Sequence, residues 1–426
     1  MKNIKVLKTD KKRIVIIGAG FAGLKLARSL KNSEYEIVLI DKRNYHQFQP
    51  LFYQVATSGL EPSSISFPLR KIFQKCNNVH IRLAEVKSVD NEKKVVITNI
   101  GEINYDILVF SQGADTNFFG MQNIKDKGYA MKSTPEALEI RNSVLRCFED
   151  ALTTENEEYR QSLMNIAIVG GGATGVELAG ALAEMKNYIL PQDYPELDFS
   201  KMNIYLIEAG EKLLANMSAK SSEKVHKYMD KLGVKIMTKS QVKNYDGNFI
   251  YVNDNKIPTK TVIWAAGIIG NKIEGLKPEI IARSNRIKVN NFNLVEGYTD
   301  IYAIGDIAYM TDKNFPNAHP QVAQVAIQQA NNLSVNLKNL LKNKEFKPFV
   351  YKDLGSMATV GRNLAVVDLP RLKFQGFLAW VFWLFIHLMS IVGVKNRIFI
   401  FINWFINYFT YDQSLRLILS EKRKNE

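Results

Sequence analysis

The chain has 426 residues, of which 46% are hydrophobic and 23% charged, a balance typical of a globular protein with two or three domains. Its two cysteines, Cys76 and Cys147, form no closely spaced pair, so we expect neither a disulfide framework nor a structural metal site. The net charge of +14 favours anionic partners, but no zinc finger, aromatic RNA-binding motif or long Lys/Arg run is present, which argues against nucleic acid. No apolar run follows the basic N-terminus, so we expect no secretory signal and place the globular part in the cytoplasm.

The beginning of the chain predicts the opening of a doubly wound α/β sheet. An apolar strand is expected over Arg13–Ile17, and apolar residues at helical spacing predict a helix over Phe21–Leu30. A second apolar strand is expected over residues 37–40. A glycine-rich turn separates the first strand from the helix, which is the order of a mononucleotide-binding unit.

The glycines of this turn have the spacing of a dinucleotide fingerprint. Gly18 permits a tight turn, Gly20 lets the backbone approach a pyrophosphate, and Gly23 lets the helix pack closely on the strand. Asp41 ends the second strand and is expected to accept a hydrogen bond from a ribose hydroxyl. The helix N-terminus favours the phosphates through its free N–H groups and its dipole.

The same order of elements returns later in the chain. A strand is expected over residues 165–169, a glycine turn over 170–175, a helix over 176–185 and a second strand over 203–207. The two fingerprints are 152 residues apart, counting from Gly18 to the first glycine of the later turn, which is a domain-sized spacing. The sequence therefore predicts two dinucleotide-binding units.

The second turn carries Gly170, Gly172 and Gly175, and its acidic partner is Glu208. The spacing to this carboxylate is long, which we attribute to an insertion around residues 188–200. A carboxylate at this place accepts from a ribose 2′-hydroxyl and repels a 2′-phosphate, so it favours NADH over NADPH. A solvated acid at the end of a strand is the alternative interpretation.

Three more apolar strands end in small residues that suit close approach to a cofactor. The strand Ile107–Phe110 is followed by Gly113, and residues 262–264 are followed by Gly267. Residues 301–304 precede Gly305 and Asp306. Two dinucleotide units in one chain need two dinucleotides, and FAD with NADH is the economical pair because hydride can pass between them.

These motifs together resemble the glutathione-reductase-like class of flavoproteins with two dinucleotide-binding domains. The resemblance implies that the first fingerprint holds FAD and the second holds NADH, and that Asp306 contacts the ribityl chain. It implies an α/β fold with two Rossmann-like domains and a C-terminal membrane-associated helical segment. The expected domains are an FAD domain over 1–160 and 275–350, an NADH domain over 161–274 and a membrane-anchoring region over 351–426.

The electron acceptor is suggested by a missing thiol. Disulfide reductases of this class carry a cysteine pair in the region that corresponds to residues 44–57, and these residues contain no cysteine. The segment 44–57 instead resembles type II NADH dehydrogenases, which are single-subunit NADH:quinone oxidoreductases. Four other segments also resemble this family, namely residues 132–133, 184–197, 323–328 and 355–362. The resemblance covers the chain from about residue 12 to residue 419. The resemblance adds Gln49 to the expected FAD site.

The resemblance also implies roles for individual side chains. Gln324 and Gln328 share one helix face and would donate to a quinone carbonyl, with exposed polar positions as the alternative. Glu177 would assist proton handling near the flavin, or would only be a carboxylate favoured by the helix dipole. Lys373 would lie near the quinone entrance, or would extend to a membrane surface. His46 is a weak candidate, and a structural histidine is the favoured interpretation.

The C-terminal region has the composition of a membrane-binding segment. Residues 374–394 contain no Asp, Glu, Lys or Arg, and three of the four tryptophans of the chain lie at Trp380, Trp383 and Trp404. Hydropathy favours a single transmembrane helix, whereas the resemblance favours two helices lying in the interface. A buried dimer interface is the third interpretation. The basic residues 416–424 suit anionic lipid.

We therefore expect an enzyme that oxidises NADH through non-covalently bound FAD and reduces a membrane quinone, menaquinone or ubiquinone, without pumping ions. It would act at the cytoplasmic face of the inner membrane, and a homodimer is left open. One alternative is an NADH diaphorase or oxidase that uses a soluble acceptor or oxygen. Another is a flavin-bound redox sensor or scaffold without catalytic function.

Overall fold

The structure is a computed structural model that describes residues 4, 10–410 and 415–420, so part of the basic segment 416–424 lies outside the described residues. The chain divides into two compact units. Unit 1 comprises Met1–His46, Phe67–Asp115 and Ile268–Asp353, and unit 2 comprises Gln47–Ser66, Thr116–Gly267 and Leu354–Glu426. Each unit contains a parallel sheet with helices, which confirms the predicted α/β class.

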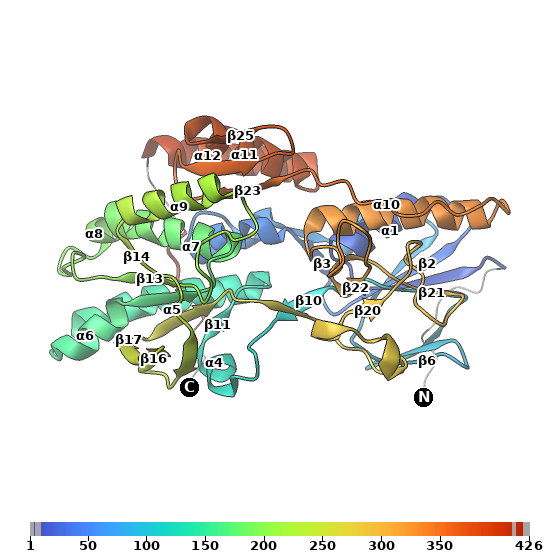
Figure 1. Ribbon diagram of the computed structural model, residues 1–426, viewed down its shortest axis with the longest axis horizontal. Helices are drawn as coiled ribbons and strands as arrows, with labels where there is room; N and C mark the ends of the chain where they lie inside the picture. Colours follow the sequence, from blue (N-terminus) through green and yellow to red (C-terminus); the bar gives the residue numbers. More distant parts are fainter. Residues whose placement is uncertain (1–3, 5–9, 411–414, 421–426) are drawn as a thin grey trace. The chain divides into compact units, whose positions relative to one another are not determined.

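Unit 1 is built on a five-stranded parallel sheet of order β21-β9-β1-β2-β5. Figure 1 shows helices α1 and α10 side by side. The strands of the sheet and the two helices are β1 (Arg13–Ile17), β2 (Glu36–Asp41), β5 (Val79–Leu83), β9 (Ile107–Phe110), β21 (Ile301–Ala303), α1 (Phe21–Leu30) and α10 (Ala323–Leu340). Smaller elements of this unit are α3 (Leu69–Ile72), β6 (Val86–Asp90), β7 (Val95–Thr98), β8 (Gly101–Asn104), β19 (Ile268–Gly270), β20 (Ile287–Lys288) and β22 (Ala308–Tyr309).

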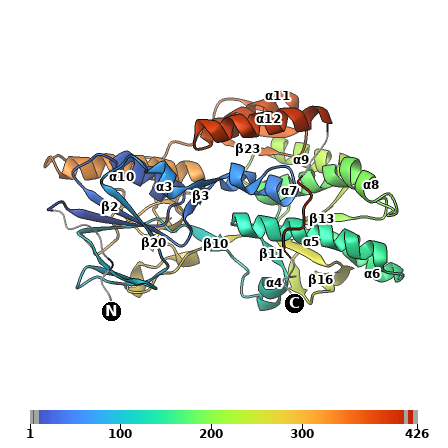
Figure 2. The same ribbon diagram turned by 180° about the vertical axis from the view of Figure 1, so that it is seen from behind.

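Unit 2 repeats this plan with a sheet of order β11-β18-β12-β13-β14, seen from behind in Figure 2. Its strands are β11 (Tyr129–Ala130), β12 (Ile166–Val169), β13 (Ile204–Ile207), β14 (Val234–Met237) and β18 (Thr261–Trp264). Its helices before the C-terminal region are α2 (Phe52–Ala56), α4 (Gln122–Lys127), α5 (Thr134–Thr153), α6 (Glu157–Met164), α7 (Ala173–Glu184), α8 (Leu190–Asp193) and α9 (Ala219–Lys231). An antiparallel sheet of β15 (Val242–Tyr245), β16 (Phe249–Val252) and β17 (Asn255–Pro258) completes this part.

The central strands of both sheets are short and mostly apolar because both faces of a parallel sheet are buried. The edge strands β5 and β14 carry polar residues at their less buried positions. In unit 1, Ile17 at the end of β1 pairs with Ile40 of β2 and with Phe110 of β9. In unit 2, Val169 at the end of β12 pairs with Ile207 of β13 and with Trp264 of β18. This register brings the carboxyl ends of neighbouring strands to one edge of each sheet, which is where ligands bind in such folds.

Two glycines of helix α7 let it pack directly against the backbone of neighbouring segments. All residues from Gly175 to Ala183 are buried. A Cβ atom at Gly175 would lie 1.9 Å from the carbonyl oxygen of Gly170, and one at Gly180 would lie 2.7 Å from the backbone of Val360. No side chain fits at either distance, so the helix lies directly against the glycine turn at its start and against Val360 along its side.

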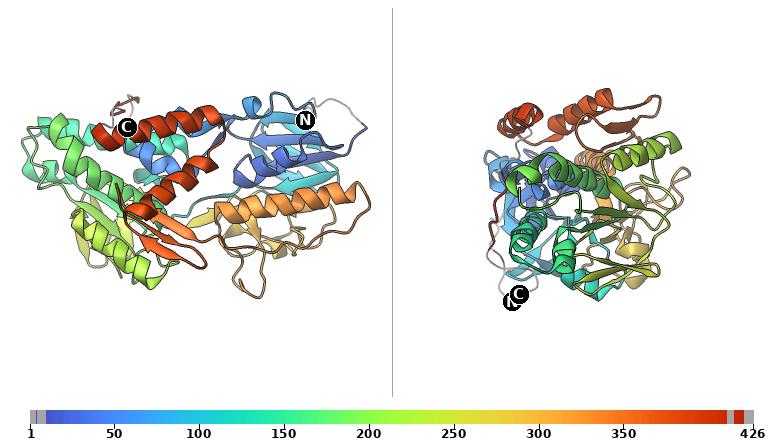
Figure 3. Two further views of the ribbon diagram at one scale, coloured as in Figure 1. Left: turned by 90° about the horizontal axis from the view of Figure 1, so that it is seen from above. Right: turned by 90° about the vertical axis from the view of Figure 1, so that its left-hand side faces the viewer.

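The C-terminal region forms a small sheet and two helices next to α9 (Figure 3). The elements are β23 (Ser356–Thr359), β24 (Ala365–Asp368), β25 (Lys373–Gln375), α11 (Phe377–Ser390) and α12 (Val394–Thr410). The single helix that hydropathy favours over residues 374–394 is therefore not formed: β25 and Gly376 precede α11, and Gly393, with φ +87°, separates α11 from α12. Among the described residues, none of the helices combines the length and the apolar character that crossing a bilayer requires.

Candidate functional site

The first glycine turn, in unit 1, has the geometry of a phosphate cradle. Gly18 has φ +95°, and a Cβ atom there would lie 2.6 Å from the Cα atom of Gln112. A Cβ atom at Gly23 would lie 1.9 Å from the carbonyl oxygen of Gly18. At Gly20, in contrast, a Cβ atom would meet nothing within 4 Å. Helix α1 begins here without a side-chain cap, so the open space lies at a helix end suited to an anion and fits a pyrophosphate.

Asp41 holds the same turn from the end of β2. Its two carboxylate oxygens accept hydrogen bonds from the backbone N–H of Ala19 at 2.6 Å and of Arg43 at 2.7 Å. Burial raises the pKa of Asp41, and these two bonds oppose the rise. His46 supports the turn from another side, since its Nδ1 lies 2.9 Å from the carbonyl oxygen of Ala19. Burial lowers the pKa of His46 to about 4, so it is an uncharged structural group.

Two further glycine turns of unit 1 lie at strand ends. Gly113 follows β9 with φ +69°, and a Cβ atom there would meet nothing within 4 Å. Gly305 has φ +76°, and its N–H donates to the side-chain oxygen of Gln329 at 2.7 Å. The carbonyl of Asp306 accepts from the amide of Gln321 at 2.9 Å. These contacts fix the backbone around the expected FAD residues and leave space beside Gly113.

The second glycine turn, in unit 2, has the same pattern of contacts as the first. Gly170 has φ +116° and lies against the Ala265 backbone, whereas a Cβ atom at Gly172 would meet nothing within 4 Å. Glu208 takes the place of Asp41: its carboxylate accepts from the N–H of Gly171 and of Gly210, both at 2.6 Å. The residues of both turns therefore fit a dinucleotide. Gly267, with φ +79°, follows β18 and lies against the ring of Phe119.

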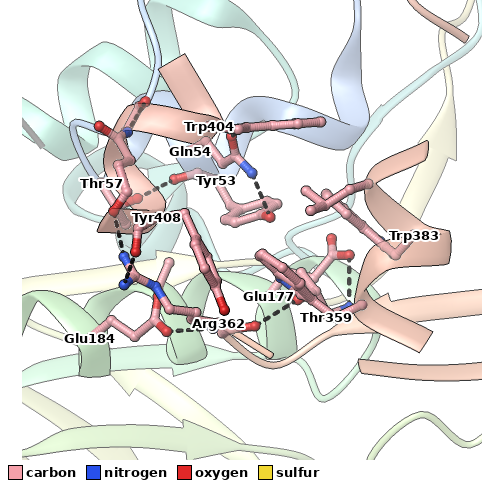
Figure 4. A pocket seen from close by; sticks show the side chains of 16 residues that line it. Tyr53, Gln54, Thr57, Glu177, Glu184, Thr359, Arg362, Trp383, Trp404 and Tyr408 are labelled. Atoms are coloured by element: carbon pink, nitrogen blue, oxygen red, sulfur yellow. Dashed lines mark hydrogen bonds between the residues drawn. The ribbon is translucent and has the colours of Figure 1, made fainter. Parts of the chain in front are cut away.

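Unit 2 also contains an aromatic pocket, shown in Figure 4. Helix α7 contributes Glu177, Ala181 and Glu184, which are i, i+4 and i+7 on one face. The other walls come from α2, the β23 segment, α11 and α12, and they are lined by Tyr53, Gln54, Thr57, Gly59, Thr359, Gly361, Arg362, Trp380, Trp383, Leu384, Trp404, Asn407 and Tyr408. The helix that follows the second dinucleotide turn therefore also forms one wall of this pocket.

Glu177 is the buried acid of the pocket. Its side chain is 8% exposed, and burial raises its pKa to about 8. The N–H of Thr359, 3.4 Å from one carboxyl oxygen, opposes this rise. The indole of Trp383 also lowers the pKa, although its N–H lies outside ordinary hydrogen-bond geometry. Burial therefore favours the protonated form of Glu177.

A second acid, Glu184, is linked to the end of α12 through Arg362. Its carboxylate accepts from the backbone N–H of Arg362, while burial raises its pKa. The guanidinium of Arg362 donates to the carbonyls of Asn407 at 2.6 Å and of Tyr408 at 2.8 Å, and it lies over the Tyr408 ring at 5.2 Å. These carbonyls belong to the last turn of α12, where a cation stabilises the helix dipole.

The other predicted site residues lie outside this pocket. Gln324 and Gln328 are half-buried on α10 in unit 1. The amide of Gln328 donates to the carbonyl of Lys352 at 2.8 Å and accepts from its N–H at 3.0 Å, so it anchors the segment after α10. Lys373 is exposed on β25, paired in register with Asp368 of β24. Gln49 is half-buried at the start of a short 3₁₀ helix in unit 2.

Sequence reasoning missed Tyr53, Gln54, Glu184 and Arg362 as pocket residues. The position of Glu184 could have been found, because it follows Glu177 by two helical turns. Arg362 carries no such signal, since its guanidinium bonds to carbonyls 45 and 46 positions away in the chain.

Family models match most of the chain. Residues 12–330 match the pyridine nucleotide-disulphide oxidoreductase family, and residues 354–411 match the NDH2 C-terminal domain. Among solved structures, NDH2 of Plasmodium falciparum in complex with NADH has a TM-score of 0.88 at 22% identity and covers 96% of this chain and 100% of its own. A sulfide:quinone oxidoreductase of Aquifex aeolicus has a TM-score of 0.71 at 19% identity, covering 96% and 93%. At these identities the likeness concerns the fold.

Two curated relatives are more similar in sequence. The type II NADH:quinone oxidoreductase Ndh of Mycobacterium tuberculosis is 33% identical over 93% of this chain and 88% of its own length. The related NdhA of the same organism is 32% identical over 93% and 87%. With the two dinucleotide turns and the C-terminal domain in place, the chain belongs to the pyridine nucleotide-disulphide oxidoreductases, and within them to the type II NADH dehydrogenases.

Proposed function

We propose that this chain oxidises NADH with the aid of FAD and reduces a quinone to quinol. One observation carries the proposal: helix α7 follows the second dinucleotide turn and also presents the protonated Glu177 to an aromatic pocket. The Mycobacterium tuberculosis relatives are named NADH:quinone oxidoreductases. A flavin-bound scaffold without catalysis would have no use for a buried acid at this place.

The two turns assign the two dinucleotides. FAD would be held by Gly18, Gly20, Gly23, Asp41, Gln49, Gly113, Gly305 and Asp306. NADH would be held in unit 2 by Gly170, Gly172, Gly175, Glu177, Glu208 and Gly267. The domains of the protein would be an FAD domain over 1–160 and 275–350, an NADH domain over 161–274 and an anchoring region over 351–426.

FAD, when bound, supplies a carrier for the two electrons that pass between the substrates. NADH gives up two electrons and one proton as hydride, whereas quinol formation takes up two electrons and two protons, so one proton comes from water. Glu177 would hold a proton at its carboxyl group and release it to a quinone oxygen, and its burial makes this proton available at neutral pH. We propose Gln324 and Gln328 as quinone-site residues and Lys373 as a residue of the quinone entrance.

Helix α12 is suited to a lipid surface because most of its exposed side chains are apolar and most of its inward side chains are polar, the reverse of a helix in a water-soluble protein. Its inward positions carry the buried Ile400 and a majority of polar or amphipathic side chains, namely Asn396, Arg397, Asn403, Trp404, Asn407 and Tyr408. Apart from Lys395 and Thr410, its exposed positions are apolar, and α11 adds more of the same kind. The exposed apolar residues of the two helices are Phe377, Leu378, Val381, Phe385, Met389, Val394, Ile398, Phe399, Phe401, Ile402, Phe405, Ile406 and Phe409. We name this set the apolar face and propose that it lies in the cytoplasmic leaflet of the inner membrane as a monotopic anchor.

The function is tested by mixing the purified protein with its substrates in two steps without oxygen. NADH should bleach the absorbance of bound FAD, and a quinone added afterwards should restore it within one turnover. Oxygen should restore it much more slowly, because the pocket offers a proton donor and an aromatic lining to a quinone ring. Reoxidation by oxygen as fast as by quinone would favour a soluble oxidase instead.

The proton of Glu177 should set the pH dependence of quinone reduction. The carboxyl is protonated below its pKa of about 8, so the rate should fall as the pH rises through about 8. Glu177→Gln should remove this limb and slow the step by about a hundredfold. Glu223→Gln, at an exposed position of α9, is the matched control and should change neither. A limb that persists in Glu177→Gln would assign the proton to another group.

Glu208 should determine the choice of nicotinamide cofactor. Glu208→Gln removes the charge that repels a 2′-phosphate, so the ratio of kcat/KM for NADH over NADPH should fall by about tenfold or more. The same change at Glu211, an exposed neighbour, should leave the ratio as it is. Equal turnover of the two cofactors by the unchanged protein would contradict the assignment.

The apolar face should bind vesicles. Leu378→Asp or Phe405→Asp should each lower the fraction that sediments with vesicles of neutral and anionic phospholipids by about tenfold or more, since a buried large apolar side chain contributes about 1.5–3 kcal/mol. Val350→Asp, at an exposed apolar position of unit 1, is the control. Unchanged sedimentation together with a smaller particle in analytical ultracentrifugation would show that this face is a homodimer interface.

A further inference from the structure

Three side chains are joined in a line between helices α12 and α2. The indole N–H of Trp404 donates to the amide oxygen of Gln54 at 2.7 Å. The amide nitrogen of Gln54 donates to the hydroxyl oxygen of Tyr53 at 2.8 Å, the bond drawn beside both residues in Figure 4. All three residues line the aromatic pocket of unit 2.

The donor and acceptor properties of these groups fix the direction of both hydrogen bonds. An indole N–H can only donate, so the Gln54 atom next to Trp404 has to be the amide oxygen. The amide nitrogen then faces Tyr53, and because an NH₂ group also only donates, the Tyr53 oxygen has to accept. The hydroxyl hydrogen of Tyr53 is therefore turned away from Gln54.

That hydrogen has no acceptor among the residues that the structure describes, although Tyr53 is only 7% exposed. Burial, with the nearby Glu177 as a smaller cause, raises the pKa of Tyr53 well above its ordinary value, so the hydrogen stays in place. The indole N–H of Trp383 is a second buried donor: it is 1% exposed, it interacts with Glu177 only outside ordinary hydrogen-bond geometry, and it has no well-formed partner in the described part of the chain. The two rings lie 6.3 Å apart.

Buried donors without partners cost free energy unless a ligand supplies an acceptor. We propose that a carbonyl oxygen of the bound quinone accepts hydrogen bonds from Tyr53 and Trp383, and that Gln54 and Trp404 are positioning residues that aim the Tyr53 hydroxyl. This inference rests on the proposed function. Both donors become stronger as negative charge builds on the quinone oxygen, so they stabilise the transition state more than the bound substrate.

The test measures both half-reactions of the full-length, FAD-loaded protein with a water-soluble benzoquinone. Tyr53→Phe removes the hydrogen and should slow quinone reduction by about a hundredfold. Trp404→Phe keeps an aromatic side chain but removes the indole N–H that holds Gln54, and Gln54→Leu removes the amide that holds the Tyr53 hydroxyl, so each should slow the same step several-fold. Reduction by NADH should be unchanged in all three. Tyr159→Phe, which removes a hydroxyl from a more exposed tyrosine of α6, is the control.

A double-mutant cycle separates aiming from simple packing. In the Tyr53→Phe background, Trp404→Phe and Gln54→Leu should cause no further loss, because the hydroxyl hydrogen that Trp404 and Gln54 orient is gone. Equal losses in both backgrounds, or no loss from either change alone, would overturn the positioning role. A normal rate in Tyr53→Phe would overturn the donor role. If NADH fails to reduce the flavin of the unchanged protein, the proposed function fails and not this inference.

Discussion

Contact between backbone atoms at helix α7 is the constraint on which the geometry of unit 2 depends. The absence of a Cβ atom at Gly175 lets the helix start against the carbonyl of Gly170, and the absence of one at Gly180 lets it lie against Val360. Such contacts are rigid, because backbone cannot change rotamer to relieve a clash. A dinucleotide at the turn and a ligand in the pocket would therefore be bound by one body, with no loop between them to absorb a shift.

The rigid packing of α7 keeps the carboxyl group of Glu177 enclosed, and this enclosure changes its protonation. A carboxyl group loses hydration when it is enclosed, and Glu177 responds by keeping its proton rather than by finding a cation. Glu184, two turns further on, is enclosed in the same helix face but accepts from the Arg362 backbone. One face of α7 thus combines an acid that has no cationic partner among the described residues and an acid that is linked through Arg362 to the end of α12, so the pocket and α12 share a support.

The elements that dinucleotide binding requires could be predicted from the sequence, because their signals are local. The bounds of β1, α1 and β9 agree with those expected, and α7 begins three residues earlier than expected. The C-terminal region could not be predicted in this way. Hydropathy counts the absence of charge over 374–394 but does not register the turns at Gly376 and Gly393, where positive φ angles change the direction of the chain. The pocket escaped prediction because Gln54 and Trp404 are 350 positions apart.

The contact between Gly180 and Val360 has a consequence for how such chains can be recombined. The two family models that match this protein, over 12–330 and 354–411, suggest separable modules, yet each supplies one half of a backbone-to-backbone contact. A hybrid that joins this nucleotide-binding part to the C-terminal part of a relative would keep the close approach at Gly180. It would fit only if the incoming segment follows the same path there, so a graft would succeed or fail on a match of main-chain shape, whatever its side chains.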